Sequence, residues 1–282
     1  NDSNLNFNIG QIYEKCNDLN KTIFFYRKSL LINPENGNAL VQLFKIYLKI
    51  FDWRSIKDIN KKLNEFGTKY FKGGEPMTFL YHDDDPHKQK LRAELFFNNY
   101  FKRKALDIKL KKNKKIKIGY LSNNFVFHPV SFLISKVIET HNRAEFEIHG
   151  YSINPIEDEV TKKIAKSFDS FKNISNESDD LANKKIREDN LDILIDLMGY
   201  TTGSRMGILS KRAAPIQISY LAYPSTTGSD QIDYIIADKN IIPQNKKSFY
   251  TEKVIYLPKT FICFDDSTKI SSTYQPKQFA NH

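Results

Sequence analysis

The stretch "KIKIGYLSNNFVFHPVSFLISK", residues 115–136, joins a strand-like segment to a helical one. Apolar and β-branched residues alternate with lysine and glycine up to Ser122, a pattern that is typical of a strand. The residues after Pro129 are helical in pattern, and proline fits the first position of a helix. The stretch therefore predicts a strand, a turn and a helix, with His128 as the residue that caps the helix.

The same alternation continues along the chain. Six further strand-like runs follow, at residues 146–153, 170–175, 191–200, 216–223, 234–238 and 253–258. Helical stretches lie between most of them, at residues 129–141, 158–168, 178–189 and 203–213. Strands that alternate with helices indicate right-handed crossovers and a parallel sheet covered on both faces. We therefore predict an α/β fold with a Rossmann-like parallel sheet over residues 115–282.

Residues 1–66 have a different, all-helical pattern. They match the tetratricopeptide order of small residue, aromatic, small, aromatic, small and proline at Gly10, Tyr13, Thr22, Tyr26, Ser29 and Pro34. Tyr13 recurs as Tyr47 one repeat later, and the second copy keeps Ala39 and Leu43. An ordinary helical hairpin is the alternative. Because one repeat cannot bury its own apolar face, we expect further repeats before Asn1.

Residues 67–114 are predicted to be a linker followed by one helix. Glycines and prolines interrupt the pattern up to Pro86, and residues 89–106 are helical in pattern. His82 and His87 flank "DDDP", which has the residue types of a metal site but is better explained as a turn with an Asp helix cap. The lysine cluster at residues 109–117 is interpreted as a solvated linker, with a nucleic-acid patch as the alternative.

Composition excludes several classes of protein. Of the 282 residues, 40% are hydrophobic and 13% aromatic, which is enough for a sizeable core. The formal charge of +10 is compatible with nucleic acid, anionic membranes or phosphorylated substrates, but the lysines are scattered. The two cysteines fit a reducing compartment. No apolar run is long enough to cross a membrane, so we expect a location in the cytoplasm, or in nucleus and cytoplasm if the source is a eukaryote.

Ligands of such sheets bind beyond the carboxyl ends of the strands. Three polar loops should open at that edge: "SNNFVFHPVS" from residue 122, "MGYTTGSRMG" from residue 198 and "YPSTTGSDQ" from residue 223. The helix dipole disfavours a charged His128, and a neutral imidazole can transfer a proton or hydrogen-bond a sugar or phosphate. Alternatively, His128 is only a cap. Arg205 could bind a diphosphate or an acceptor backbone, or lie on the surface without a ligand.

Known nucleotide-binding motifs are missing from these loops. "GYTTGSR" lacks the Lys-Ser/Thr end of a phosphate-binding P-loop. No G-x-G-x-x-G follows a strand, which argues against an oxidoreductase that uses nicotinamide or flavin.

Four ordered stretches resemble the O-linked N-acetylglucosamine transferase family, including its Spindly-like and bacterial relatives. They are "KIKIGYLSNNFVFHPVS", "LDILIDLMGYTTGSR", "RAAPIQISYLAYPSTTG" and "IDYIIAD". The resemblance implies the N-terminal catalytic half of a glycosyltransferase-B fold, preceded by tetratricopeptide repeats. It also implies inverting, metal-independent transfer of a sugar from a UDP-sugar to Ser or Thr of proteins. N-acetylglucosamine is the expected sugar, with fucose or glucose as alternatives. No cofactor is implied, because the UDP-sugar is the donor substrate.

The resemblance also assigns site residues. His128 matches the active-site histidine of the family and is the expected catalytic residue. The expected substrate-binding residues are Tyr200, Thr201, Arg205, Arg212, Gln217, Leu221, Ala222, Tyr223, Pro224, Thr226 and Gly228. Ala222 and Ser225 replace glycines that are usual in the family, which would crowd the backbone that faces the sugar.

In the family, a second Rossmann-like half holds most contacts to UDP. We therefore expect this polypeptide to be inactive alone and to need that second half as a partner. Acceptor proteins or peptides would be further partners, bound through the repeats, whereas membrane and nucleic acid are not expected. The rival hypothesis is a non-catalytic tetratricopeptide scaffold for protein interactions.

Overall fold

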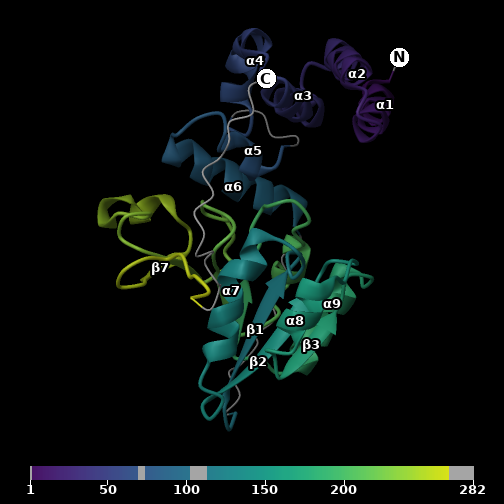
Figure 1. The fold of residues 1–282 in the computed structure, drawn as a ribbon. Helices are drawn as coiled ribbons and strands as arrows, with labels where there is room; N and C mark the ends of the chain where they lie inside the picture. Colours follow the sequence, from purple (N-terminus) through teal and green to yellow (C-terminus); the bar gives the residue numbers. More distant parts are fainter. Residues whose placement is uncertain (1, 69–73, 102–112, 267–282) are drawn as a thin grey trace, which may run out of the picture.

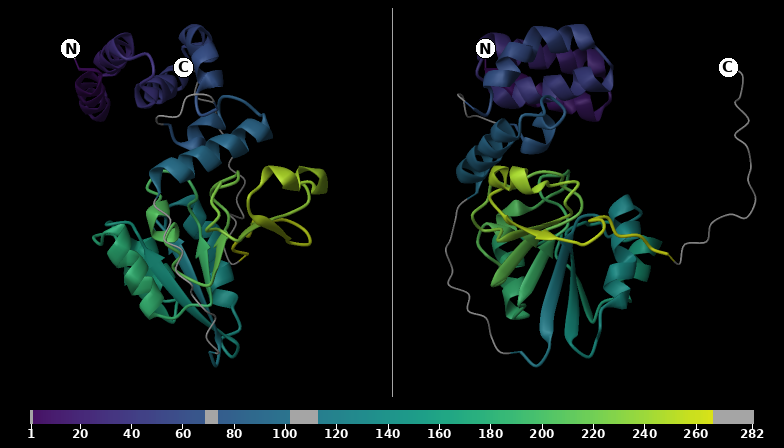
Figure 2. Two further views of the ribbon diagram at one scale, coloured as in Figure 1. Left: turned by 180° about the vertical axis from the view of Figure 1, so that it is seen from behind. Right: turned by 90° about the vertical axis from the view of Figure 1, so that its left-hand side faces the viewer.

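The computed structural model describes residues 2–68, 74–101 and 113–266. Four helices form the N-terminal part, two more lead from it, and an α/β part follows (Figure 1). The two parts lie at opposite ends of the molecule with α6 between them, as the two views of Figure 2 show. The fold predicted from the sequence, an all-helical segment followed by a Rossmann-like parallel sheet, is confirmed.

The N-terminal part consists of two helical hairpins. The helices are α1 (Ser3–Lys15), α2 (Leu19–Ile32), α3 (Gly37–Lys49) and α4 (Trp53–Glu65). Each begins after an Asp or Asn whose side chain accepts a backbone N–H of the first turn, namely Asp2, Asp18, Asn36 and Asp52. Such caps satisfy amide groups that have no partner inside the helix, so they fix where each helix starts.

Small residues bring α1 and α2 together. A Cβ on Gly10 would lie 2.5 Å from the ring of Tyr26, so only glycine allows this approach. Tyr26, Thr22 and Ser29 are fully buried, and Tyr13 stacks on Phe25. The small and aromatic positions of the sequence pattern are therefore the positions that pack the hairpin.

Two helices connect this part to the sheet: α5 (Pro76–Phe79) and α6 (Pro86–Tyr100). Asp85 accepts hydrogen bonds from the backbone of His87 and Lys88 at the start of α6, so the predicted Asp cap is present. In the described stretches, no three His, Cys, Asp or Glu side chains are arranged to hold a metal ion. Residues 102–112, which include part of the predicted helix and of the lysine cluster, lie outside the described residues.

All paired strands of the α/β part are parallel. The sheet order is β3-β2-β1-β4-β5-β6-β7. The strands are β1 (Ile116–Ser122), β2 (Phe146–Ser152), β3 (Ser170–Asn173), β4 (Ile193–Asp196), β5 (Ile216–Ser219), β6 (Tyr234–Ala237) and β7 (Lys253–Tyr256). The connecting helices are α7 (Pro129–Thr140), α8 (Glu159–Ala165), α9 (Asp179–Glu188), α10 (Met206–Leu209) and the 3-10 helix η1 (Gln244–Phe249).

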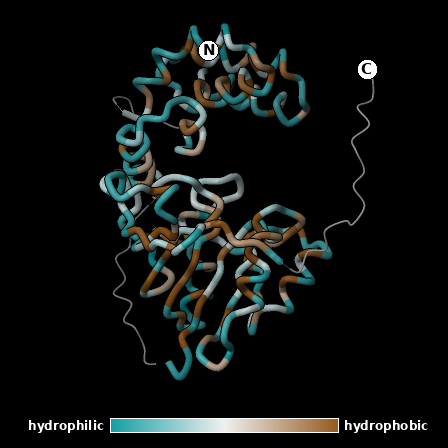
Figure 3. Tube along the Cα trace, turned by 60° about the vertical axis from the view of Figure 1, so that its left-hand side comes forward, coloured by the Kyte–Doolittle hydropathy of each residue, from teal (hydrophilic) through white to brown (hydrophobic). Residues whose placement is uncertain are grey.

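Helices cover both faces of the sheet because successive side chains of β1 point to opposite faces. Ile118 and Tyr120 pack with α7 and α8, whereas Leu121 packs with α9, α10 and α6. Hydrophobic segments follow the strands in the interior, and the outer turns of the helices are hydrophilic (Figure 3). Across the described residues, no helix is both long and apolar enough to cross a membrane.

Candidate functional site

The strand order reverses between β1 and β4. From β1 the chain continues outward to β2 and β3, and from β4 it continues in the other direction to β5. Loops at such a switch point diverge and leave a crevice at the carboxyl edge of the sheet, which is where open α/β sheets bind ligands. The three polar loops predicted from the sequence all lie at this edge, because β1, β4 and β5 are parallel.

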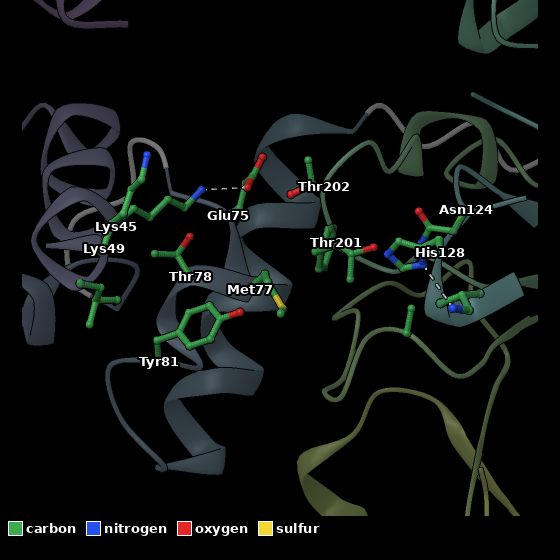
Figure 4. A pocket seen from close by; sticks show the side chains of 14 residues that line it. Lys45, Lys49, Glu75, Met77, Thr78, Tyr81, Asn124, His128, Thr201 and Thr202 are labelled. Carbon is green, nitrogen blue, oxygen red and sulfur yellow. Dashed lines mark hydrogen bonds and ion pairs between the residues drawn. The ribbon is translucent and has the colours of Figure 1, made fainter. Parts of the chain in front are cut away.

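A cleft of about 770 Å³ lies between this edge and the helical part. One wall comes from the loops after β1, β4 and β5 and from the first turn of α7, through Asn124, His128, Val130, Tyr200, Thr201, Thr202 and Ala222. The other wall comes from α3, α5 and their flanks, through Lys45, Leu48, Lys49, Glu75, Met77, Thr78 and Tyr81. Figure 4 shows the α3 lysines and His128 on opposite sides of the space.

His128 both caps a helix and borders the cleft. Its Nδ1 accepts the backbone N–H of Val130 at 3.2 Å, at the start of α7. The second ring nitrogen points into the cleft (Figure 4). Partial burial lowers the pKa of His128 from its ordinary value of 6.5, so the ring is neutral at pH 7. The two readings of this residue, a cap or a site residue, are therefore compatible.

The backbone around His128 is held by its neighbours. Ser131 donates to the carbonyl of Asn124 at 2.5 Å, and Thr161 donates to that of Phe125 at 2.6 Å. Asp158, the cap of α8, accepts the Phe127 N–H at 2.6 Å. Because α7 and α8 both bind this loop, the imidazole is presented from a fixed backbone.

Asp196 ends β4 and organises the next loop. Its two carboxylate oxygens accept the backbone N–H of Met198 at 3.1 Å and of Gly199 at 2.8 Å. Gly199 has φ +55°, and a Cβ there would lie 2.3 Å from Cβ of Tyr223. Complete burial raises the pKa of Asp196 to about 7. Asp196 was not predicted as a site residue, although an acid that ends a continuous apolar strand is a signal for one.

Tyr200 and Thr201 follow that turn and reach the cleft. The Tyr200 hydroxyl donates to the carbonyl of Thr227 at 2.7 Å, and only 5% of the residue is exposed. Its ring meets Phe96 of α6 edge to face. Thr201 is half-buried and donates to the Met198 carbonyl at 2.8 Å, and Thr202 beside it is exposed. Of these three cleft residues, Thr202 was not predicted.

Arg205 does not line the cleft. Its Nε donates to Asp179 at 2.8 Å, and its two terminal nitrogens donate to the carbonyls of Ile174 and Glu177 at 2.9 and 2.6 Å. Arg205 borders a second pocket of about 180 Å³, which shares Glu75, Tyr200 and Thr201 with the cleft. The guanidinium therefore ties the start of α10 to α9, which differs from both a free surface arginine and an arginine aimed at the cleft.

Arg212 and Gln217 also lie away from the cleft. Arg212 forms a bidentate ion pair with Asp233. Gln217 is fully buried and donates to the carbonyls of Leu209 and Gln231 at 3.0 and 2.7 Å. Both side chains therefore bind the segment just before β6, at the amino ends of β5 and β6.

In the loop after β5, Ala222 alone of the predicted residues lines the cleft. Leu221 has φ +78°, Tyr223 is buried and Pro224 is exposed. Thr226 donates to the buried carboxylate of Glu252 at 2.6 Å. Gly228 has φ +65°, and a Cβ there would lie 2.2 Å from the backbone nitrogen of Glu94, so this glycine lets α6 dock on the loop.

The entire helical wall of the cleft was not predicted from the sequence, and neither were Asn124 and Thr202 of the loops or Val130 of α7. Lys45, Lys49 and Tyr81 belong to segments that the sequence pattern assigned to repeats and linker. Nothing in their local sequence marks them, because the cleft forms only when the helical part packs above the sheet edge.

Comparison with known proteins identifies relatives of this chain. Residues 95–276 match Glycosyl transferase family 41. An Arabidopsis thaliana protein named "Probable UDP-N-acetylglucosamine--peptide N-acetylglucosaminyltransferase SEC" is 35% identical over 164 residues, which are 58% of this chain and 17% of that protein. A Caenorhabditis elegans UDP-N-acetylglucosamine–peptide N-acetylglucosaminyltransferase is 36% identical over 155 residues, 54% of this chain and 13% of that protein.

A solved structure shares the fold. The structure of a Thermobaculum terrenum O-GlcNAc transferase mutant matches with a TM-score of 0.71 at 22% sequence identity, over 92% of this chain and 51% of that one. This chain thus spans about half of that protein and less than a fifth of the two named relatives. The sequence resemblance to O-linked N-acetylglucosamine transferases is confirmed, and the chain belongs to glycosyl transferase family 41.

Proposed function

We propose that this chain forms one side of the active site of a protein O-glycosyltransferase. The enzyme would move a sugar, N-acetylglucosamine in the first instance, from a UDP-sugar to Ser or Thr of proteins. The family match and the activities named for the relatives support this class. The observation that carries the proposal is the cleft that runs past His128 between the sheet edge and the helical part.

Sugar transfer needs an acceptor oxygen held against the anomeric carbon, and it needs stabilisation of the departing diphosphate. We propose direct, inverting displacement, in which the acceptor oxygen bonds to the anomeric carbon, the diphosphate leaves with the electron pair of the broken bond, and the hydroxyl proton passes to the departing diphosphate. The cleft has a volume of about 770 Å³, and polar side chains line it both from the loops at the sheet edge and from the helical wall. The reaction is proposed to need neither a resident cofactor nor a metal.

The role proposed for His128 follows from its hydrogen bonds. Because Nδ1 already accepts the Val130 N–H, the neutral ring carries its proton on Nε2. Nε2 then offers an N–H to the cleft. In this state the imidazole donates a hydrogen bond to a sugar or acceptor oxygen, and it has no free lone pair with which to take the hydroxyl proton. We therefore assign His128 the role of a donor that positions the reacting groups.

The proposal includes further groups outside this cleft. A second Rossmann-like half would bind the uridine and most of the diphosphate, and acceptor proteins would approach along the repeats. A reducing location such as the cytoplasm fits the two free cysteines, Cys16 and Cys263.

Two substitutions of His128 distinguish its role as the cap of α7 from its role in sugar transfer. In the full-length protein, His128→Ala should lower kcat/KM for sugar transfer at least about tenfold, or 1.4 kcal/mol of transition-state stabilisation. It should also cost about 1 kcal/mol of folding stability, since the cap is lost. His128→Asn keeps an oxygen that can cap α7 at Val130, so its melting temperature should stay near that of the wild type while transfer still falls.

The measurement is UDP-sugar turnover on an acceptor peptide, together with thermal unfolding of the same samples. If His128→Asn transfers sugar at the wild-type rate, the imidazole has no role beyond the cap. If the wild-type protein binds acceptor peptides but transfers no sugar from any UDP-sugar, the scaffold hypothesis replaces the enzyme.

A further inference from the structure

Two lysines project from the helical wall of the cleft. Lys45 and Lys49 are four residues apart on α3, so they lie one above the other on the same face of the helix. Figure 4 shows both side chains on the side of the space opposite His128. An extended chain that reaches His128 through this cleft would therefore run beside two ammonium groups.

The charge of these lysines is only partly balanced. Lys45 lies 3.4 Å from the carboxylate of Glu75, which also borders the cleft. Lys49 donates to the amide oxygen of Asn17 at 3.2 Å, which is a neutral partner. Among the described residues that line the cleft, Glu75 supplies the single carboxylate, and the opposite wall carries no charge when His128 is neutral. The cleft therefore has a net positive charge, located on α3.

The cleft continues along the repeats from the same point. A second hollow of about 350 Å³ shares Lys45 and Glu75 with it and adds residues of α1, α3 and α6, among them Gln11, Gln42 and Tyr100. Lys45 thus lies at the junction of the two hollows. A peptide that occupies both must pass it, and this places the lysines beside the acceptor's flanking residues.

We propose that Lys45 and Lys49 select acceptor segments that carry acidic side chains on the side of the target Ser or Thr that lies against α3. This inference rests on the proposed function, because it concerns the acceptor of that same cleft. Exposed ion pairs are weak, so each pair should change the acceptor preference by about two- to fivefold, and the preference should shrink as salt is added.

The donor diphosphate is also an anion, but the structure favours the acceptor as the partner of these lysines. They belong to the helical part, and the groove beyond Lys45 leads along the repeats and away from the sheet edge. A diphosphate bound by the lysines would affect the Michaelis constant of the UDP-sugar. A side chain of the acceptor would affect the Michaelis constant of the peptide, so kinetics separates the two.

The test uses the full-length protein and a set of peptides with one target serine. Asp, Asn or Lys is placed at successive positions on either side of that serine. We expect the Asp peptides to have a lower KM on one side only. Lys49→Glu should reverse this preference, so that the Lys peptides have the lower KM. Lys45→Gln should weaken the preference for the Asp peptides. Lys57→Glu is the matched control, since Lys57 is exposed on α4 and is not among the residues that line the cleft.

The outcomes are distinguishable. Equal rates of sugar transfer to the Asp, Asn and Lys peptides would overturn this inference and leave the proposed function standing. A rise in the KM of the UDP-sugar in Lys49→Glu, with unchanged peptide order, would assign the lysines to the donor and also overturn it. Absence of transfer to every peptide by the wild type would instead contradict the proposed function. Both lysines are at least partly exposed, and melting temperatures confirm that the variants fold.

Discussion

His128 shows how one side chain can serve structure and chemistry together. Its Nδ1 caps α7 and its other ring nitrogen faces the cleft, so the cap determines which nitrogen carries the proton. The sequence predicted the position from Pro129 and the preceding strand. It could not predict the tautomer, because that depends on a hydrogen bond to Val130 whose geometry exists only in the folded loop.

The lowered pKa of His128 gives a pH dependence with a defined sign. Burial favours the neutral ring, so in the window just below 6.5 the unfolded chain binds more protons than the folded one. The contribution of His128 to stability is therefore complete above pH 6.5 and is lost as the pH falls through the lower folded pKa. Protonation of Nδ1 also removes the cap.

The predicted result is a melting temperature of the wild type that falls relative to that of His128→Asn as the pH is lowered below 6.5. The comparison isolates His128, because all other titrating groups are shared by the two proteins. Thermal unfolding of both proteins across this pH range is the measurement. If the melting temperatures of the two proteins change with pH in parallel, protonation of the His128 ring does not affect the cap of α7.

At the scale of elements, α6 connects the helical part to the sheet. Arg92 on α6 is 2% exposed, pairs with Asp83 at 2.8 Å and donates to the carbonyl of Phe66 at 3.2 Å. Its guanidinium lies 4.4 Å from the ring centre of Phe79 in α5. On its other side α6 contacts the loop at Gly228. Arg92 therefore fixes the end of α4 and α5 above the sheet edge, and with them one wall of the cleft.

Replacing Arg92 should loosen this arrangement. Arg92→Met leaves Asp83 without its partner, and we expect a loss of about 3 kcal/mol in unfolding free energy. The KM for acceptor peptides should rise more than the KM for the UDP-sugar, because the wall of the cleft that moves belongs to the helical part. Urea unfolding and steady-state kinetics are the measurements.

Lys88→Met is the control for Arg92→Met, since Lys88 lies on the same helix with an exposed side chain and a 4.0 Å contact to Asp85. Equal stability of Arg92→Met and Lys88→Met would contradict the role of Arg92 in fixing the end of α4 and α5 above the sheet edge. A Michaelis constant that changes for the donor alone would contradict the link to the acceptor wall.

Elements were easier to predict than their contacts. Each of the seven strands among the described residues lies within a strand-like run of the sequence. An Asp or Asn cap marks the start of α1 to α4 and of α6. The 3-10 helix η1 was missed, because residues 244–249 have no apolar periodicity and follow Pro243. The hydrogen bonds that Arg205, Arg212 and Gln217 form within the protein were not predicted either, since their partners lie on other elements.

At the scale of the whole molecule, the cleft is a property of packing. Parallel strands required the loops after β1, β4 and β5 to meet at one edge, and that part could be deduced from the sequence. The opposite wall could not, because its residues come from α3 and α5, whose place above the edge is set by α6. The central claim is therefore that acceptor segments occupy the space between these two walls.

Site-specific photo-crosslinking shows whether an acceptor lies between the two walls. A photoreactive phenylalanine analogue replaces Tyr81 or Thr202, which border the cleft from opposite walls, or Trp53, which is 62% exposed and is not a cleft residue. Each full-length variant is irradiated with a labelled acceptor peptide. We predict capture from positions 81 and 202, abolished by excess unlabelled peptide, and no competed capture from position 53. Competed capture at position 53 with none at positions 81 and 202 would contradict it.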